Sequence, residues 1–210
     1  MIIKGIKRVQ GIVGAFLYVG RAVNNKLVLA LSAIGAQKAA ANKETKDVVE
    51  QLLDYISTYP DDGIYFRKID MILAAHTDTG FLNKFKSRSR AGAHIFLSEI
   101  YPKPKLNGPV LTIAQIITSV MVSSAEAEMA ALYITDTKMI PLHNTLIEMV
   151  WTQPKLPIQT YNSTVVGFTN KTIINKAKKS AHMELWWLRE RESQDQFRYY
   201  WAPGSENEGF

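Results

Sequence analysis

The chain has 210 residues, 47% of them hydrophobic and 21% charged, which is typical of a folded globular protein and excludes a wholly disordered one. It has no cysteine, so disulfides, thiolate metal sites and a cysteine nucleophile are excluded, in agreement with an intracellular location, cytoplasmic or nuclear. The formal net charge of +6 suits a polyanionic partner, although it equally suits an ordinary basic protein.

The first third of the chain is expected to be helical. Residues 8–36 are largely apolar with a break at Asn24 and Asn25, which predicts one or two buried helices. Neither apolar run reaches the roughly 18–20 residues of a membrane span, so no membrane is expected, and a signal peptide is the alternative. A further helix, predicted by apolar residues at helical spacing, ends at Pro60. We therefore expect a small helical domain over residues 1–62.

The remainder, residues 63–210, alternates between strand and helix patterns. The predicted strands are residues 63–68, 71–78, 91–100, 110–123, 157–161 and 196–202. The predicted helices are residues 123–140, ended by Pro141, then 142–150 and 175–193. This order predicts an α/β fold with a mixed central sheet and flanking helices.

The stretch SSAEAEMAAL carries two glutamates two residues apart. Ser123 and Glu126 form S-x-x-E, a capping box in which Glu126 reaches back to the helix start. Glu128 lies about 200° around the helix from Glu126, so the two cannot easily share one metal ion. It falls instead in a stripe at spacings of three and four with Ala125, Leu132, Thr135 and Met139. Metal binding explains a carboxylate in that stripe, and an exposed helix glutamate is the alternative.

Basic residues alternate in the stretch FLNKFKSRSR. A strand or hairpin would place Lys84, Lys86, Arg88 and Arg90 on one side, where they can contact nucleic-acid phosphates. A solvated hairpin is the alternative. The chain has no G-x-S-x-G, no Walker A and no G-x-G-x-x-G motif, so a lipase, a kinase and a nucleotide-binding enzyme find no support.

Several segments, in order, resemble the C-terminal part of copia-type retrotransposon polyproteins. Residues 8–35 resemble the end of the reverse transcriptase, which would make residues 1–62 a remnant of its thumb or connection. Residues 63–210 resemble its ribonuclease H domain. The matching pieces are HTDTGFLN for Y-x-D-A-D-W-A-G, SRSRAGAHIFL for S-T-S-G-Y, SSAEAEMAAL for S-T-A-E-A-E-Y-x-A-L, TYNSTVVGF for C-D-N-x-S-A, and LWWLRE for the helix that carries the last acid.

The resemblance implies a ribonuclease H-like fold and cleavage of the RNA strand of an RNA–DNA hybrid. It implies two Mg²⁺ ions held by four acids, because clustered carboxylates offset the repulsion between two cations. The implied partners are an RNA–DNA hybrid or other nucleic acid and the polymerase part of a reverse transcriptase.

The four family acids map onto this chain with two departures. The first falls on Asp78 and the second on Glu128, the two expected metal ligands. The third falls on Tyr161, whose phenol has an ordinary pKa near 10 and ligates Mg²⁺ poorly. The fourth falls on His182, a catalytic candidate whose neutral imidazole prefers softer metals. Asn162 matches its family position and is an expected nucleic-acid contact.

These departures predict that cleavage is weak or absent. Two alternatives stay open at this point. One is a catalytically inactive domain that binds nucleic acid through the same fold and basic face. The other is a decayed transposon fragment without a selected function.

Overall fold

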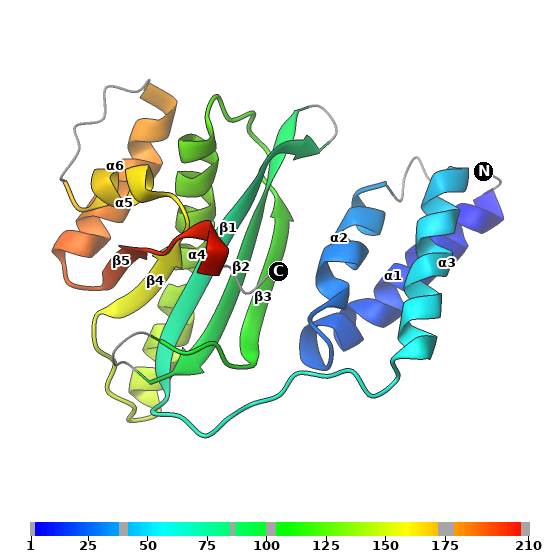
Figure 1. The fold of residues 1–210 in the computed structure, drawn as a ribbon, viewed down its shortest axis with the longest axis horizontal. Helices are drawn as coiled ribbons and strands as arrows, with labels where there is room; N and C mark the ends of the chain where they lie inside the picture. The colour runs from blue at the N-terminus through cyan, green and yellow to red at the C-terminus, as the bar shows by residue number, and fades with distance from the viewer. Residues whose placement is uncertain (1–2, 38–41, 85–86, 100–103, 172–178, 207–210) are drawn as a thin grey trace. The chain divides into compact units, whose positions relative to one another are not determined.

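The computed structural model describes residues 3–37, 42–84, 87–99, 104–171 and 179–206. The chain divides into two compact units, Met1–Tyr65 and Phe66–Phe210 (Figure 1). The expected domain boundary, after residue 62, lies close to this division, and the identity of the two domains stays a prediction.

The first unit consists of α1 (Ile3–Ala22), α2 (Leu27–Gln37) and α3 (Lys43–Thr58). Asn42 caps α3, because its Oδ1 accepts a hydrogen bond from the Thr45 amide at 2.9 Å. No helix among the described residues is long and apolar enough to cross a bilayer. The buried core of this unit is apolar and comes from all three helices: Val9, Leu27, Leu31, Ile34, Val49 and Leu52.

The second unit is built on a five-stranded mixed sheet. Its strands are β1 (Ile72–Lys84), β2 (Arg88–Ser98), β3 (Pro109–Ile116), β4 (Leu156–Thr160) and β5 (Phe197–Trp201), in the order β3-β2-β1-β4-β5. The pairs β1–β2 and β2–β3 are antiparallel, whereas β1–β4 and β4–β5 are parallel (Figure 1). The helices are α4 (Ser124–Glu148), α5 (Ser163–Thr169) and α6 (Lys179–Ser193), followed by the short 3₁₀ turn η1 (Gly204–Glu206).

The main core lies between the sheet and α4. Alternate residues of each strand face this helix, as the period of two in a strand requires. The strand members of the core are Leu73, Ala75, Ala93, Ile95, Ile113, Leu156, Ile158, Phe197 and Tyr199, and α4 contributes Met129, Leu132, Met139 and Leu146.

Two predicted elements differ from the structure. Residues 63–68 form no strand, because the segment pairs with no strand of the sheet. Pro141 does not end a helix but lies within α4. Its missing amide removes one helical hydrogen bond. The helix continues because Met139 and Leu146, on either side of the proline, are buried in the same core. Thr145 also donates from Oγ1 to the Pro141 carbonyl at 2.9 Å.

A buried carboxyl ties α4 to β5. Asp136 is 0% exposed, and its Oδ2 accepts a hydrogen bond from the Tyr199 hydroxyl, whereas its Oδ1 is buried without a partner. Burial raises the pKa of Asp136 well above its usual range, and the bond from Tyr199 opposes this only in part. The carboxyl is therefore protonated in the fold at pH values where it would ionise in water.

We expect Tyr199→Phe to lower the free energy of unfolding by about 1–3 kcal/mol, because it leaves both oxygens of Asp136 buried and unpaired. Tyr200→Phe is the matched control, since the neighbouring hydroxyl is buried without a hydrogen-bond partner. Urea unfolding of the three proteins measures the difference. Equal losses in both variants would show that the Asp136 contact contributes nothing specific.

The same pair predicts a pH dependence. The folded state keeps the Asp136 proton above about pH 4, where an unfolded aspartate loses it. The unfolding free energy should therefore fall as pH rises from about 4 towards the raised pKa of the folded state. In Asp136→Asn this part of the pH dependence of the unfolding free energy should vanish. An unchanged slope would show that Asp136 is not its source.

Candidate active site

Asp78 lies in β1, at the carboxyl end of the parallel pairing with β4. Thr77 is the partner of Thr160, the last residue of β4, and Asp78 is the next residue of β1. Asp78 is half-buried, and its Oδ1 accepts a hydrogen bond from the Thr79 amide at 2.7 Å. Carboxyl ends of adjacent parallel strands are a common place for ligand sites in α/β folds.

Glu128 approaches the same place from α4. Its side chain is only 5% exposed, so the alternative of an exposed helix glutamate is wrong. Its Oε1 accepts a hydrogen bond from Thr79 Oγ1 at 2.8 Å, and its Oε2 accepts one from Thr160 Oγ1 at 3.4 Å. Strands β1 and β4 thus each supply one hydroxyl to a carboxylate on the helix.

Burial raises the pKa of Glu128 to about 7, and the negative charge of Asp78 contributes to the rise. The hydrogen bonds from Thr79 and Thr160 act in the opposite direction, because they stabilise the charged form. The two carboxyl groups lie close to each other, because Thr79 donates its amide to Asp78 and its hydroxyl to Glu128. Glu128 is therefore divided between its protonated and charged forms near neutral pH.

Glu126 has the separate capping role that the spacing predicts. Ser123 Oγ accepts from the Glu126 amide at 3.2 Å, and Glu126 Oε2 accepts from the Val122 amide at 2.9 Å. The carboxylate reaches the amide before the cap residue rather than that of the cap residue itself. The two glutamates of SSAEAEMAAL therefore do different things, one at the helix start and one against the sheet.

Tyr161, where the resemblance predicts the third acid, directly follows β4. Its hydroxyl accepts a hydrogen bond from Gln159 Nε2 at 3.1 Å. Gln159 and Tyr161 are two residues apart and share a side of the chain, whereas Thr160 between them contacts Glu128. The structure therefore brings Thr160, and not Tyr161, into hydrogen-bonding contact with the buried glutamate.

The other two predicted site residues are His182 and Asn162. His182 lies in α6, but its side chain is outside the described residues. Asn162 caps α5, because its Oδ1 accepts from the amides of Thr164 at 3.1 Å and Val165 at 3.2 Å. Asn162 thus has a structural role that is independent of any nucleic-acid contact.

The basic residues do not form one exposed row. Lys84 and Arg88 are partners across the β1–β2 hairpin, although the Lys84 side chain and all of Lys86 lie outside the described residues. Arg90 lies on β2 between β1 and β3 and is only 5% exposed, and burial lowers its pKa. The expectation of four cations on one surface is therefore wrong for Arg90.

Sequence reasoning missed Thr79, Thr160 and Asn83. The two threonines contact Glu128, and the period of two in β1 and β4 is the only signal that points to them. Asn83 covers Gly80, where a Cβ atom would lie 2.0 Å from Asn83 Nδ2. Because the resembling family has its second aspartate at Gly80, that acid would require Asn83 to move.

The residues present do not fit the two Mg²⁺ ions that the resemblance implies. Among the described residues, no group of three or more His, Cys, Asp or Glu side chains is arranged to hold a metal. Both oxygens of Glu128 already accept hydroxyl hydrogen bonds from within the protein. Asp78 and Glu128 supply only two of the four carboxylates that the resemblance implies for offsetting the repulsion between two cations.

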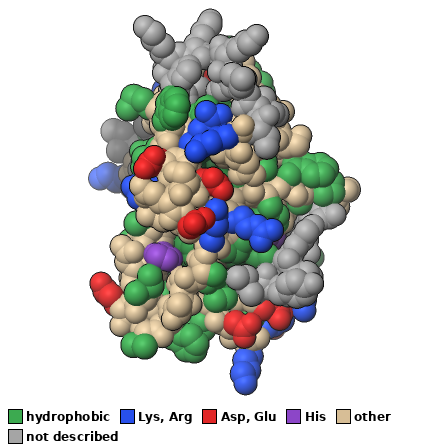
Figure 2. All heavy atoms as spheres, turned by 90° about the vertical axis from the view of Figure 1, so that its left-hand side faces the viewer, with side chains coloured by type: hydrophobic (Ala, Val, Ile, Leu, Met, Phe, Trp, Pro, Cys, Tyr) green, Lys and Arg blue, Asp and Glu red, His purple; other side chains and the backbone are tan. Residues whose placement is uncertain are grey.

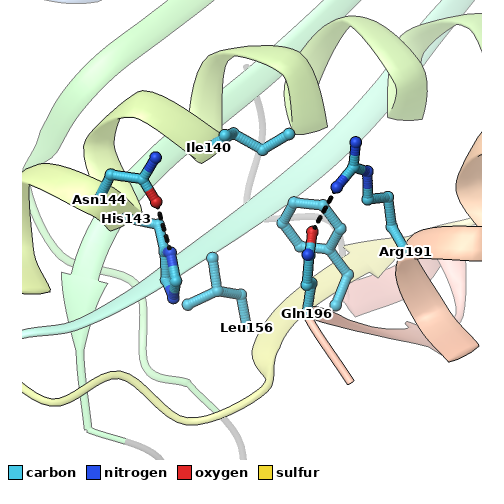
Figure 3. Close-up of a pocket in the computed structure, with 7 residues that line it drawn as sticks. Ile140, His143, Asn144, Leu156, Arg191 and Gln196 are labelled. Atoms are coloured by element: carbon cyan, nitrogen blue, oxygen red, sulfur yellow. Dashed lines mark hydrogen bonds between the residues drawn. The ribbon is translucent and has the colours of Figure 1, made fainter. Parts of the chain in front are cut away.

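A separate pocket lies at the other end of β4 (Figure 3). Leu156, which lines it, is about 13 Å along the strand from Thr160. In the pocket Arg191 Nη1 donates to Gln196 Oε1 at 3.1 Å, and His143 Nδ1 lies 3.3 Å from Asn144 Oδ1. Its volume is about 230 Å³, and no carboxylate is among its lining residues Ile140, His143, Asn144, Leu156, Arg191, Gln196 and Phe197.

The surface that carries α6 and β5 has no single dominant charge. Figure 2 shows basic and acidic side chains next to one another on this face. Lys155, just before β4, forms ion pairs with Glu192 at 3.0 Å and Asp195 at 2.9 Å. Among the residues that the structure describes, this face therefore presents cations and anions together rather than a continuous basic track for nucleic acid.

No protein-family model and no curated protein matches this chain. Solved structures with a similar fold include LC11-RNase H1, isolated from compost by a metagenomic approach, with a TM-score of 0.50 and 11% identity over 65% of this chain and 88% of that one. The foamy viral protease-reverse transcriptase is also similar. In complex with an RNA/DNA hybrid its TM-score is 0.55 and its identity 12% over 98% of this chain, and with dsDNA the values are 0.53 and 13% over 94%. The matches cover only 26% and 38% of the two viral chains. The chain therefore contains a ribonuclease H-like fold.

Proposed function

We propose that the chain is the ribonuclease H-like domain of a copia-type retrotransposon, with impaired cleavage of the RNA strand of RNA–DNA hybrids. The observation that carries the proposal is the convergence of β1, β4 and α4 on Asp78 and Glu128. These acids occupy the first two positions of the family site, and Glu128 is buried where an ordinary helix glutamate would be exposed. A buried carboxylate beside a second carboxylate is costly, and active sites are where such groups gather.

The helical unit supports the retroelement origin. We assign residues 1–62 to a remnant of the reverse transcriptase thumb or connection and residues 63–210 to the ribonuclease H-like domain. The viral protease-reverse transcriptase in complex with an RNA/DNA hybrid matches 98% of this chain, which includes helical residues before the sheet. The copia assignment itself rests on the order of the sequence segments from residue 8 onwards.

The proposed ancestral chemistry uses two Mg²⁺ ions, which activate water and stabilise the leaving oxygen of the cleaved RNA strand. Here Asp78 and Glu128 would be the ligands, with His182 in the position of the last acid. Tyr161 offers a phenol that is engaged with Gln159. The loss of two carboxylates removes negative charge from the place where it is needed, and cleavage is impaired for that reason.

A second candidate function is binding of nucleic acid without cleavage. It is favoured by the two hydroxyl hydrogen bonds on Glu128, which satisfy the acid within the protein. The net charge of +6 suits a phosphate backbone, and Arg88 and the lysines of the hairpin are the proposed contacts.

Cleavage of a labelled RNA–DNA hybrid by the purified chain tests the first proposal. We expect slow cleavage at most, in Mg²⁺ or Mn²⁺, and its loss in Asp78→Asn. Asp70→Asn is the matched control, because Asp70 is an exposed aspartate just before β1. Cleavage that survives Asp78→Asn would remove Asp78 from the site. Hybrid retained without cleavage, with affinity falling steeply as salt rises, would favour the binding function.

Restoring the missing acids is a second test. The double variant Tyr161→Asp with His182→Asp should cleave the hybrid at least about tenfold faster than the original chain, because it returns two carboxylates to the metal site. Tyr161→Phe with His182→Asn is the control, since it changes both side chains without adding an acid. If the double aspartate variant folds, as judged by circular dichroism, and gains no activity, the assignment of these two positions is wrong.

A further inference from the structure

We propose that Thr79 is a positioning residue that holds Asp78 and Glu128 apart from a shared divalent cation. The proposal rests on the proposed function, because it concerns the same two acids. It goes further by identifying a third residue that decides whether they can bind an ion. Neither Tyr161 nor His182 is part of this effect.

Thr79 contacts both acids at once. Its backbone amide donates to Asp78 Oδ1 at 2.7 Å, and its hydroxyl donates to Glu128 Oε1 at 2.8 Å. Each acid therefore directs an oxygen at an atom of Thr79. A shared Mg²⁺ or Mn²⁺ would need oxygens of both acids about 2.0–2.2 Å from one common point.

The close approach of α4 to the sheet makes the hydroxyl contact possible. Thr79 lies on the side of β1 that faces α4, and its partner on β2 is Ala91. Ala91 packs with Ala130 and Ala131 of α4, and all three are almost completely buried. Methyl side chains at this contact let the helix backbone come close to the strand, which brings Glu128 within reach of a short threonine side chain.

The hydrogen bond that Glu128 accepts from the Thr79 hydroxyl is stronger than the one that it accepts from the Thr160 hydroxyl. Thr160 Oγ1 lies 3.4 Å from Oε2, a long distance for an O–H···O bond, whereas 2.8 Å is typical. A hydrogen bond to a carboxylate is stronger than one between neutral groups. Reorienting Glu128 towards an ion is therefore opposed mainly by the Thr79 bond.

Mn²⁺ binding by the full chain tests this directly. The loss of the free-ion signal in electron paramagnetic resonance gives the affinity for the original chain, Thr79→Ala and Thr79→Ser. We expect Thr79→Ala to bind Mn²⁺ about tenfold more tightly, the change that one hydrogen bond to a charged group supports. Thr79→Ser should bind as the original chain does, because it keeps the hydroxyl.

The double variant Thr79→Ala with Glu128→Gln tests whether the gain in Mn²⁺ affinity depends on Glu128. It should return the Mn²⁺ affinity to that of the original chain, since the amide cannot replace the carboxylate as a ligand. A gain that persists without Glu128, or equal affinities of the alanine and serine variants, would overturn the proposal. Thermal unfolding checks each variant, and Thr79→Val, which also lacks the hydroxyl, replaces the alanine variant if that one does not fold.

Hybrid cleavage measured on the same samples separates the two proposals. If Thr79→Ala binds Mn²⁺ more tightly but cleaves no hybrid, the role of Thr79 is supported. The same result would show that metal binding alone does not restore ribonuclease H activity. No gain in Mn²⁺ affinity would refute the role of Thr79, whatever the cleavage result.

Discussion

The burial of a carboxylate between α4 and the sheet is the constraint on which the candidate site depends. Glu128 cannot be solvated, so the protein has to supply its hydrogen bonds, and threonine hydroxyls on β1 and β4 do so. This requirement fixes the rotation of α4 about its axis and its distance from β1. It also places Asp78, at the carboxyl end of the β1–β4 pairing, close enough to influence the pKa of Glu128.

A second buried carboxyl repeats the arrangement two turns further along α4. Asp136 accepts a hydrogen bond from Tyr199 of β5, as Glu128 does from Thr79 of β1. The helix therefore contacts strands on both sides of β4 through acid–hydroxyl pairs set in an apolar interface. Such pairs require a particular register, because a shift of the helix by one residue would leave a carboxyl buried without a donor. The apolar packing around Met139 and Leu146 provides the stabilisation, and the pairs select one arrangement.

Much of the fold follows from local sequence patterns, but contacts between elements do not. The stretch AGAHIFLSEI in β2 and the helical spacing around Val49 predict their elements correctly. Pro141 misled the helix prediction because the burial that carries α4 past it depends on tertiary packing. Asp78 and Glu128 were recognised through resemblance to a family. Thr79 was not, since nothing local to a threonine in a strand indicates a glutamate 49 residues away. The exposure of Arg90 was predicted wrongly, because alternation indicates only on which face of a strand a side chain lies. It does not indicate whether other residues cover that face.

The predicted replacement of two acids, at Tyr161 and His182, and the contacts of Thr79 have the same electrostatic consequence. In a site with four acids, metal ions offset the mutual repulsion of the carboxylates, so the fold and the ions depend on each other. If Tyr161 and His182 occupy two of the acid positions, as proposed, only two carboxyl groups remain to be accommodated. Protonation of Glu128, whose pKa rises to about 7, and hydroxyl hydrogen bonds suffice for that. On this proposal the site does not need an ion for its stability, and the Thr79 contacts oppose ion binding.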